Sequence, residues 1–276
     1  MGNRLMGECV VLSKKPKGMT VSTPIAPTAA RKLRVYNLLM GVLHAAQALA
    51  VIALANDFAL PVTATFLENA PGAEDPELTT LVDVPLAWGV VAFLIVSALA
   101  HFIIVAPGVF EKYLKQLAER RNYARWIEYS VSSSIMVVLI ALLVGIADVA
   151  ALIAIAGANA AMILFGLLQE KYEDPGENVS LISYWFGVIA GAIPWIAIGI
   201  YLFTPGSDAN APGFVYGIFF SLFVFFNCFA AVMVLQYKKI GPWARYEFGE
   251  STYVLLSLIA KSALAWQVFA GALAAG

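Results

Sequence analysis

Charged side chains are scarce in this sequence. Only 13% of its 276 residues are Asp, Glu, Lys or Arg, whereas a soluble domain carries about 25%. Hydrophobic residues make up 61% of the chain. Cysteine is also rare: Cys9 lies near the N-terminus and Cys228 in an apolar segment, so no disulfide framework is indicated. This composition excludes an ordinary soluble domain and predicts a polytopic helical membrane protein.

The motifs of common enzymes are missing as well. The sequence contains no P-loop, dinucleotide-binding glycine pattern, zinc motif or hydrolase elbow in a credible setting. Its two histidines, His44 and His101, do not have the spacing to cysteines or carboxylates that a metal site requires. We therefore expect no metal site and no nucleic-acid partner, and we do not expect an enzyme.

Seven apolar runs are long enough to cross a bilayer as helices, which takes about 20 residues each. Turns rich in proline and glycine separate most of them. The runs are residues 33–55, 85–106, 123–146, 149–169, 180–203, 213–237 and 250–274. The predicted fold is an all-α, seven-helix transmembrane bundle over residues 33–276, preceded by a partly disordered tail over residues 1–32.

Basic residues fall on one side of these segments. They lie before the first segment, between the second and third, after the fourth, and between the sixth and seventh. The opposite connections contain none, and Lys261 is the one basic residue in the middle of a segment. The positive-inside rule then places the N-terminus in the cytoplasm and the C-terminus outside, in a multi-pass protein of the cell membrane.

The first outer connection, residues 56–84, is long and acidic. Pieces such as VTATF and LTTLV have the composition of strands. A solvated loop and an ordered cap or oligomer contact both fit this pattern. The residues alone favour the solvated loop.

Lys261 stands near the middle of the last apolar run. It lies about eleven residues from either polar end, roughly 16 Å along a helix, which is too far to reach the interface comfortably. A lysine at that depth costs roughly 2.5–3.5 kcal/mol on insertion scales, so it is a candidate functional residue that needs a partner. A buried amine can form a Schiff base with a carbonyl compound, and the protonated form requires an anion.

Glu128 is the first candidate for that anion, because it is the only carboxylate well inside an apolar run. The alternative is that Glu128 lies at the interface and pairs with Arg125. Ser257 lies four residues before Lys261, on the same helix face. Its hydroxyl would bond either the lysine nitrogen or only its own backbone.

Other polar and aromatic side chains in the segments leave two interpretations open. His44 and His101 would form a titratable cluster near Glu128, or each would be a hydrogen-bonded structural residue. Met162 and the aromatic residues of the fifth and sixth segments would line an apolar ligand pocket, or they would belong to the core and the lipid-facing surface.

Seven helices with a lysine in the seventh and a glutamate in the third resemble the retinal-binding rhodopsins, and more specifically the heliorhodopsins. SLIAKS around Lys261, WIEYS around Glu128, Ser257 and the two histidines carry the resemblance. The cytoplasmic N-terminus and the long connection after the first helix agree with it. The resemblance covers about residues 33–274.

The resemblance implies that Lys261 holds all-trans retinal as a protonated Schiff base, with Glu128 as counterion and Ser257 as a neighbour. It also implies an extracellular cap with strands over residues 56–84 that contributes to a homodimer. Residues expected in a polar cavity on the cytoplasmic side, as proton-acceptor candidates, are His44, His101 and Gln47. Residues expected to line the retinal pocket are Met162, Trp195 and Phe226.

Two absences bear on the function within this family of folds. Outward-pumping rhodopsins resemble each other in an aspartate four residues before the lysine and a proton donor about eleven residues beyond the counterion. Here these positions are Ser257 and Leu139. The expected function is therefore light sensing, through an unidentified cytoplasmic partner, and the resemblance implies a slow photocycle. The alternatives are a light-driven proton channel or transporter, and a membrane enzyme or non-retinal transporter with a Lys261–Glu128 ion pair.

Overall fold

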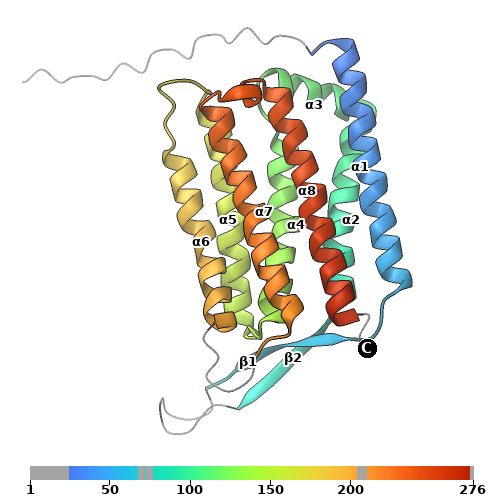
Figure 1. Ribbon diagram of the computed structural model, residues 1–276, viewed down its shortest axis with the longest axis vertical. Helices are drawn as coiled ribbons and strands as arrows, with labels where there is room; N and C mark the ends of the chain where they lie inside the picture. Colours follow the sequence, from blue (N-terminus) through green and yellow to red (C-terminus); the bar gives the residue numbers. More distant parts are fainter. Residues whose placement is uncertain (1–24, 68–71, 73–76, 204–209, 274–276) are drawn as a thin grey trace, which may run out of the picture.

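Seven helices of membrane-spanning length and hydropathy stand side by side in the computed structural model (Figure 1). The structure describes residues 25–67, 72, 77–203 and 210–273. The seven helices are α1 (Pro27–Ala53), α2 (Leu86–Val105), α4 (Tyr123–Leu143), α5 (Val149–Tyr172), α6 (Ile182–Phe203), α7 (Gly213–Tyr237) and α8 (Tyr246–Val268). A 3-10 turn, η1 (Gly241–Ala244), precedes α8, and a π-helical turn, η2 (Phe269–Leu273), continues it. The predicted seven-helix membrane fold is confirmed.

Two helices begin earlier than the hydrophobic pattern predicts. The first starts at Pro27 rather than at residue 33, because proline is well suited to the first helical turn although charged residues follow it. The last starts at Tyr246 rather than at residue 250. The expected tail over residues 1–32 therefore ends before Pro27, and residues 1–24 lie outside the described part of the chain.

The helices pack in chain order for the first part of the bundle. Helix α1 lies against α2, α2 against α4, α4 against α5, and α5 against α6. Helix α7 lies against α8, which also contacts α1 and α2 and so closes the bundle. The interior between α2, α4 and α8 contains fully buried apolar side chains, among them Phe93, Leu94, Ile140 and Leu264.

A short helix that the sequence analysis missed, α3 (Val109–Ala118), lies at one end of the bundle (Figure 1). It buries Phe110, Tyr113 and Leu117, which recur every three or four residues, and it exposes its lysines. Its ten residues are too few to span a membrane and carry several charges, so a search for long apolar runs passes over it.

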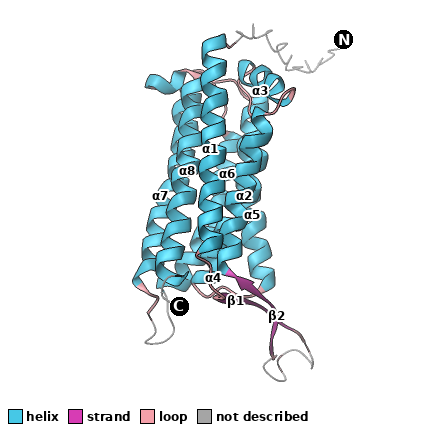
Figure 2. Ribbon diagram, turned by 90° about the vertical axis from the view of Figure 1, so that its right-hand side faces the viewer, coloured by secondary structure: helices cyan, strands magenta, loops and turns pink. Residues whose placement is uncertain are grey.

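The connection between α1 and α2 forms a hairpin at the other end of the bundle (Figure 2). Strand β1 (Ala59–Thr65) pairs antiparallel with β2 (Leu78–Pro85), with an irregularity between Val62 and Thr63. The Thr63 amide donates to the Ala147 carbonyl at 2.9 Å, which ties the hairpin to the turn between α4 and α5. The interpretation as a solvated loop is therefore wrong and the ordered cap is correct, because β1 buries residues against the bundle.

Candidate functional site

The amine of Lys261 meets a carboxylate inside the bundle. Its Nζ donates to Glu128 Oε1 at 2.7 Å and to Ser257 Oγ at 2.8 Å. The lysine is 3% exposed, and the Glu128 side chain is 9% exposed. The structure thus brings Lys261 together with the two residues that the sequence analysis placed around its nitrogen, Glu128 of α4 and Ser257 of α8.

A residue that the sequence analysis missed completes the surroundings of the carboxylate. Ser97 of α2 is buried, and its hydroxyl lies 2.6 Å from Glu128 Oε1. Ser97 lies four residues before His101, so the two residues share one face of α2. This spacing could have indicated Ser97 from the sequence. The ring of Tyr129 is also close, with its centroid 5.1 Å from Lys261 Nζ. Three helices, α2, α4 and α8, therefore converge on one ion pair.

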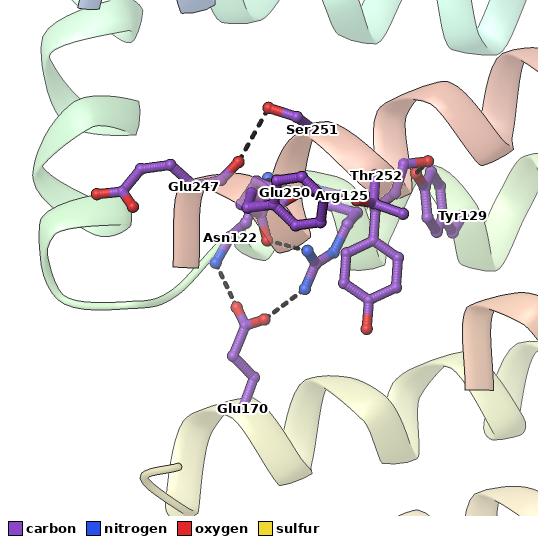
Figure 3. Close-up of polar contacts among 10 residues, drawn as sticks. Asn122, Arg125, Tyr129, Glu170, Glu247, Glu250, Ser251 and Thr252 are labelled. Carbon is purple, nitrogen blue, oxygen red and sulfur yellow. Dashed lines mark hydrogen bonds and ion pairs between the residues drawn. The ribbon is translucent and has the colours of Figure 1, made fainter. Parts of the chain in front are cut away.

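The alternative partner for Glu128 is wrong, because Arg125 pairs elsewhere. Its guanidinium donates to the carboxylates of Glu170 in α5 and Glu250 in α8 (Figure 3). The backbone N–H of Asn122 also donates to Glu170. The Asn122 side chain donates to Glu250 Oε2 at 2.7 Å.

This cluster of Asn122, Arg125, Glu170 and Glu250, the arginine cluster, is a polar centre that the sequence analysis missed. All four residues are buried. In the sequence, Glu170 directly follows the fourth apolar run, Glu250 begins the seventh, and Arg125 stands near the start of the third. These residues meet only because three helices are rotated in a particular way about their axes. The spacing of residues along the chain does not reveal that rotation. The cluster joins the ends of α4, α5 and α8 nearest to α3.

The two histidines lie together. Their rings stack with centroids 5.8 Å apart and an interplanar angle of 12°. His101 Nδ1 lies 2.9 Å from Asn37 Oδ1, whereas neither nitrogen of the fully buried His44 has a hydrogen-bond partner among the described residues. A cavity of about 30 Å³, enough for a water molecule, touches His101, Glu128 and Arg125.

Gln47, the third residue expected in this polar cavity, does not line it. Its side-chain oxygen accepts from Trp266 Nε1 at 3.2 Å, and its amide donates to the Leu43 carbonyl. Gln47 lies about one helical turn beyond His44, so its side chain meets α8 at a different level. The expected place of Gln47 is therefore corrected. His101 lines the small cavity, whereas His44 does not line it and packs its ring on that of His101.

A larger apolar cavity of about 490 Å³ begins at Lys261 and Ser257. It runs between α4, α5, α6, α7 and α8, and most of its wall is apolar or aromatic. Its walls include all three side chains that were expected to line a pocket: Met162, Trp195 and Phe226.

Aromatic rings and glycines together shape this cavity. Trp195 of α6 meets Phe223 and Phe226 of α7 edge-on, with ring centroids 5.3 Å and 5.4 Å away. Gly191 of α6 lets α5 approach closely, because a Cβ there would lie 2.3 Å from Met162 Sδ. The wall is thus closely packed at these positions.

The cavity fits an elongated apolar aldehyde such as retinal. Its volume lies within the range of about 300–1,000 Å³ that is common for small-molecule sites. Its apolar wall suits a polyene, and the one amine at its end has a carboxylate beside it to balance an iminium charge. Lys261 would hold the aldehyde carbon, and the walls from α5, α6 and α7 would contact the chain and ring.

A family model of heliorhodopsins matches residues 33–273, most of the chain. The chain belongs to the heliorhodopsin family. This family is one of rhodopsins rather than typical enzymes, and membership implies a retinal chromophore. The comparison with curated protein sequences gives no match.

Solved microbial rhodopsins share the fold of this heliorhodopsin. Exiguobacterium sibiricum rhodopsin is 17% identical, with a TM-score of 0.58, and the match covers 89% of this chain and 97% of that one. A light-driven proton pump from Leptosphaeria maculans is 14% identical, with a TM-score of 0.52, and the match covers 88% of this chain and 96% of that one. At these identities the likeness shows the seven-helix fold alone.

The arginine cluster generates a prediction about stability. Arg125→Met leaves the carboxylates of Glu170 and Glu250 buried without their cation, so the variant is expected to lose about 3–5 kcal/mol of unfolding free energy. Unfolding by denaturant in detergent micelles measures this loss. The matched control is Lys112→Met, an exposed site on α3 where little change is expected. Equal stability of the two variants would contradict the structural role of the cluster.

Proposed function

We propose that this heliorhodopsin is a light-sensing photoreceptor in which Lys261 binds all-trans retinal as a protonated Schiff base. One observation carries the proposal. A buried amine stands at the end of an apolar cavity, 2.7 Å from a carboxylate. A buried ion pair without a ligand would not need a cavity of about 490 Å³ next to it.

In this proposal Glu128 is the counterion of the protonated nitrogen. Ser257 and Ser97 support it, because the first lies 2.8 Å from Nζ and the second 2.6 Å from the Glu128 carboxylate. Hydrogen bonds to the carboxylate favour its charged form and so retain the proton on the nitrogen in the dark. Retinal, when bound, supplies the absorption of visible light and the isomerisation that follows.

Met162, Trp195 and Phe226 hold the polyene in this proposal. Their rings and thioether exclude water and limit the shapes that the cavity accepts. The tight packing of Trp195 against its aromatic neighbours supports a restrictive wall.

Glu128 and His101 are the candidates to receive the proton held at the Lys261 nitrogen, with His44 stacked behind His101. The small cavity between His101 and Glu128 supports a short, water-assisted route. Because this route ends in buried side chains, the proton would return slowly, which agrees with a slow photocycle.

The placement in the cell membrane is also part of the proposal. The described basic residues outside the helix centres lie at the end of the bundle that carries α3, which supports a cytoplasmic N-terminus. The exposed lysines and arginines of this end offer a surface to a cytoplasmic signalling partner. Exposed apolar residues on β2, Leu78, Leu81 and Val82, support a homodimer through the hairpin. The segment 33–276 would act as one retinal-binding unit.

Sensing is favoured over transport by two side chains. Ser257 replaces a carboxylate beside the nitrogen, and Leu139 of α4 is buried where a proton donor would be needed. A vectorial relay needs an acceptor on one side of the nitrogen and a donor on the other. The titratable residues named here lie on the side of the nitrogen nearer to α3.

The first experiment is a visible absorption spectrum after addition of all-trans retinal. The parent protein is expected to show a visible band, and Lys261→Ala is expected to lose it, because the covalent link is gone. Lys112→Ala, which removes an exposed lysine, serves as the control and is expected to keep the band. A band that survives in Lys261→Ala, or no band in any variant, would overturn the proposal.

The counterion role of Glu128 has its own test. Glu128→Gln removes the negative charge next to the protonated nitrogen, which disfavours the charged form. The variant is expected to lose its visible colour at a lower pH than the parent, or to absorb strongly to the red. A pH titration of the spectrum measures this, with Glu119→Gln at an exposed position as control. Identical spectra and titrations in the parent and Glu128→Gln would assign the counterion elsewhere.

The choice between sensing and transport is tested in lipid vesicles. Vesicles that contain the retinal-loaded protein are expected to show no protonophore-sensitive pH change under illumination, because the relay lacks a second carboxylate. A proton-pumping rhodopsin in the same vesicles is the positive control. A sustained light-driven pH change that a protonophore abolishes would favour transport instead.

A further inference from the structure

We propose that Asn37 of α1 is a positioning residue that fixes the tautomer of His101, so that Nε2 is the nitrogen available to accept a proton. The inference rests on the proposed function for the proton step. It concerns the resting protein, however, and the tautomer can be measured without retinal.

The orientation of the Asn37 amide is determined by its own helix. Asn37 is 1% exposed, and its Nδ2 donates to the Leu33 carbonyl at 2.9 Å. A carbonyl oxygen can only accept, so the amide nitrogen must face Leu33. The other end of the amide, Oδ1, is therefore the atom that lies 2.9 Å from His101 Nδ1.

The surroundings of this amide include α3. Tyr113 of α3 is buried and lines the same small cavity as Asn37 and His101. Burial raises the pKa of the Tyr113 phenol, so the phenol stays neutral. The Asn37 amide is thus oriented by its own helix before it meets His101 on α2.

The consequence for His101 follows from the hydrogen-bonding capacity of an amide oxygen. Because Oδ1 can only accept, Nδ1 of His101 must carry the hydrogen. A neutral imidazole then keeps its lone pair on Nε2. His44 has no such partner among the described residues, so the two stacked histidines are not equivalent. Among the described residues, the charges of Glu128 of α4 and Lys261 of α8 act on His101, and Arg125 lines the same small cavity.

A fixed tautomer matters because proton transfer needs a lone pair that is already in place. If His101 carried its hydrogen on Nε2 instead, it would first have to release one proton before it could bind another on the same atom. Asn37 prevents this without touching the reacting nitrogen of Lys261.

The chain contains only two histidines, which makes the test direct. Protein labelled with ¹⁵N-histidine and prepared without retinal is compared by NMR with a His44→Phe variant, which assigns the His101 signals. The tautomer is read from which ring nitrogen gives the protonated signal. Asn37→Leu removes the acceptor. Asn159→Leu is the control. Asn159 is equally buried, but its amide contacts Ser133 and Ser134 of α4 rather than a histidine.

The parent and Asn159→Leu are expected to carry the hydrogen on Nδ1 of His101, and Asn37→Leu is expected to shift it to Nε2. A parent protein with the hydrogen on Nε2, or an unchanged tautomer in Asn37→Leu, would overturn the inference even if the visible band depends on Lys261. In retinal-loaded protein, light-induced proton uptake by His101 is expected to slow on the order of 10²-fold in Asn37→Leu. The absence of a visible absorption band from the retinal-treated parent would instead refute the proposed function, and the tautomer result would still hold.

Discussion

The burial of one lysine amine constrains the rest of this structure. An ammonium group in the hydrocarbon region is costly unless an anion lies beside it, and Glu128 from another helix supplies that anion at 2.7 Å. Ser257 and Ser97 satisfy further hydrogen-bonding positions of the pair. Since the charge is balanced locally, the neighbouring cavity can remain apolar. These contacts join α2, α4 and α8 at the depth of Lys261. The small polar cavity and the larger apolar cavity both lie next to this ion pair.

The sequence predicts those parts of the site that depend on depth and on spacing within one helix. Lys261 and Glu128 stand out because charges inside apolar runs are rare, and Ser257 follows from its distance of one turn. Asn37 and the arginine cluster depend instead on how neighbouring helices are rotated, which one sequence does not contain. Short elements were missed or underestimated for a different reason. Helix α3 and the hairpin are too short and too polar to be recognised by membrane-spanning hydropathy.

The shape of the apolar cavity depends as much on missing side chains as on aromatic ones. A Cβ at Gly166 would lie 2.3 Å from Trp126 Cζ3, and a Cβ at Gly191 equally close to Met162 Sδ. Both large side chains line the cavity. Any side chain at these glycines would therefore push Trp126 or Met162 out of place, because both neighbouring helices are closely packed. The shape of the cavity is in this way determined by the contacts between α4 and α5 and between α5 and α6.

The polar side chains of the interior give the molecule a direction. The histidine pair, Asn37 and the arginine cluster lie between Lys261 and the end that carries α3, whereas Phe93, Leu94 and Ile140 fill the core toward the hairpin. A proton that leaves the lysine nitrogen under the proposed function has titratable neighbours on one side and packed hydrocarbon on the other. Under that proposal the proton would return by the route on which it left, and the cycle would change the charge near α3 without moving a proton across the membrane. A reversible change of charge close to a surface helix is what a sensor needs and what a pump must avoid.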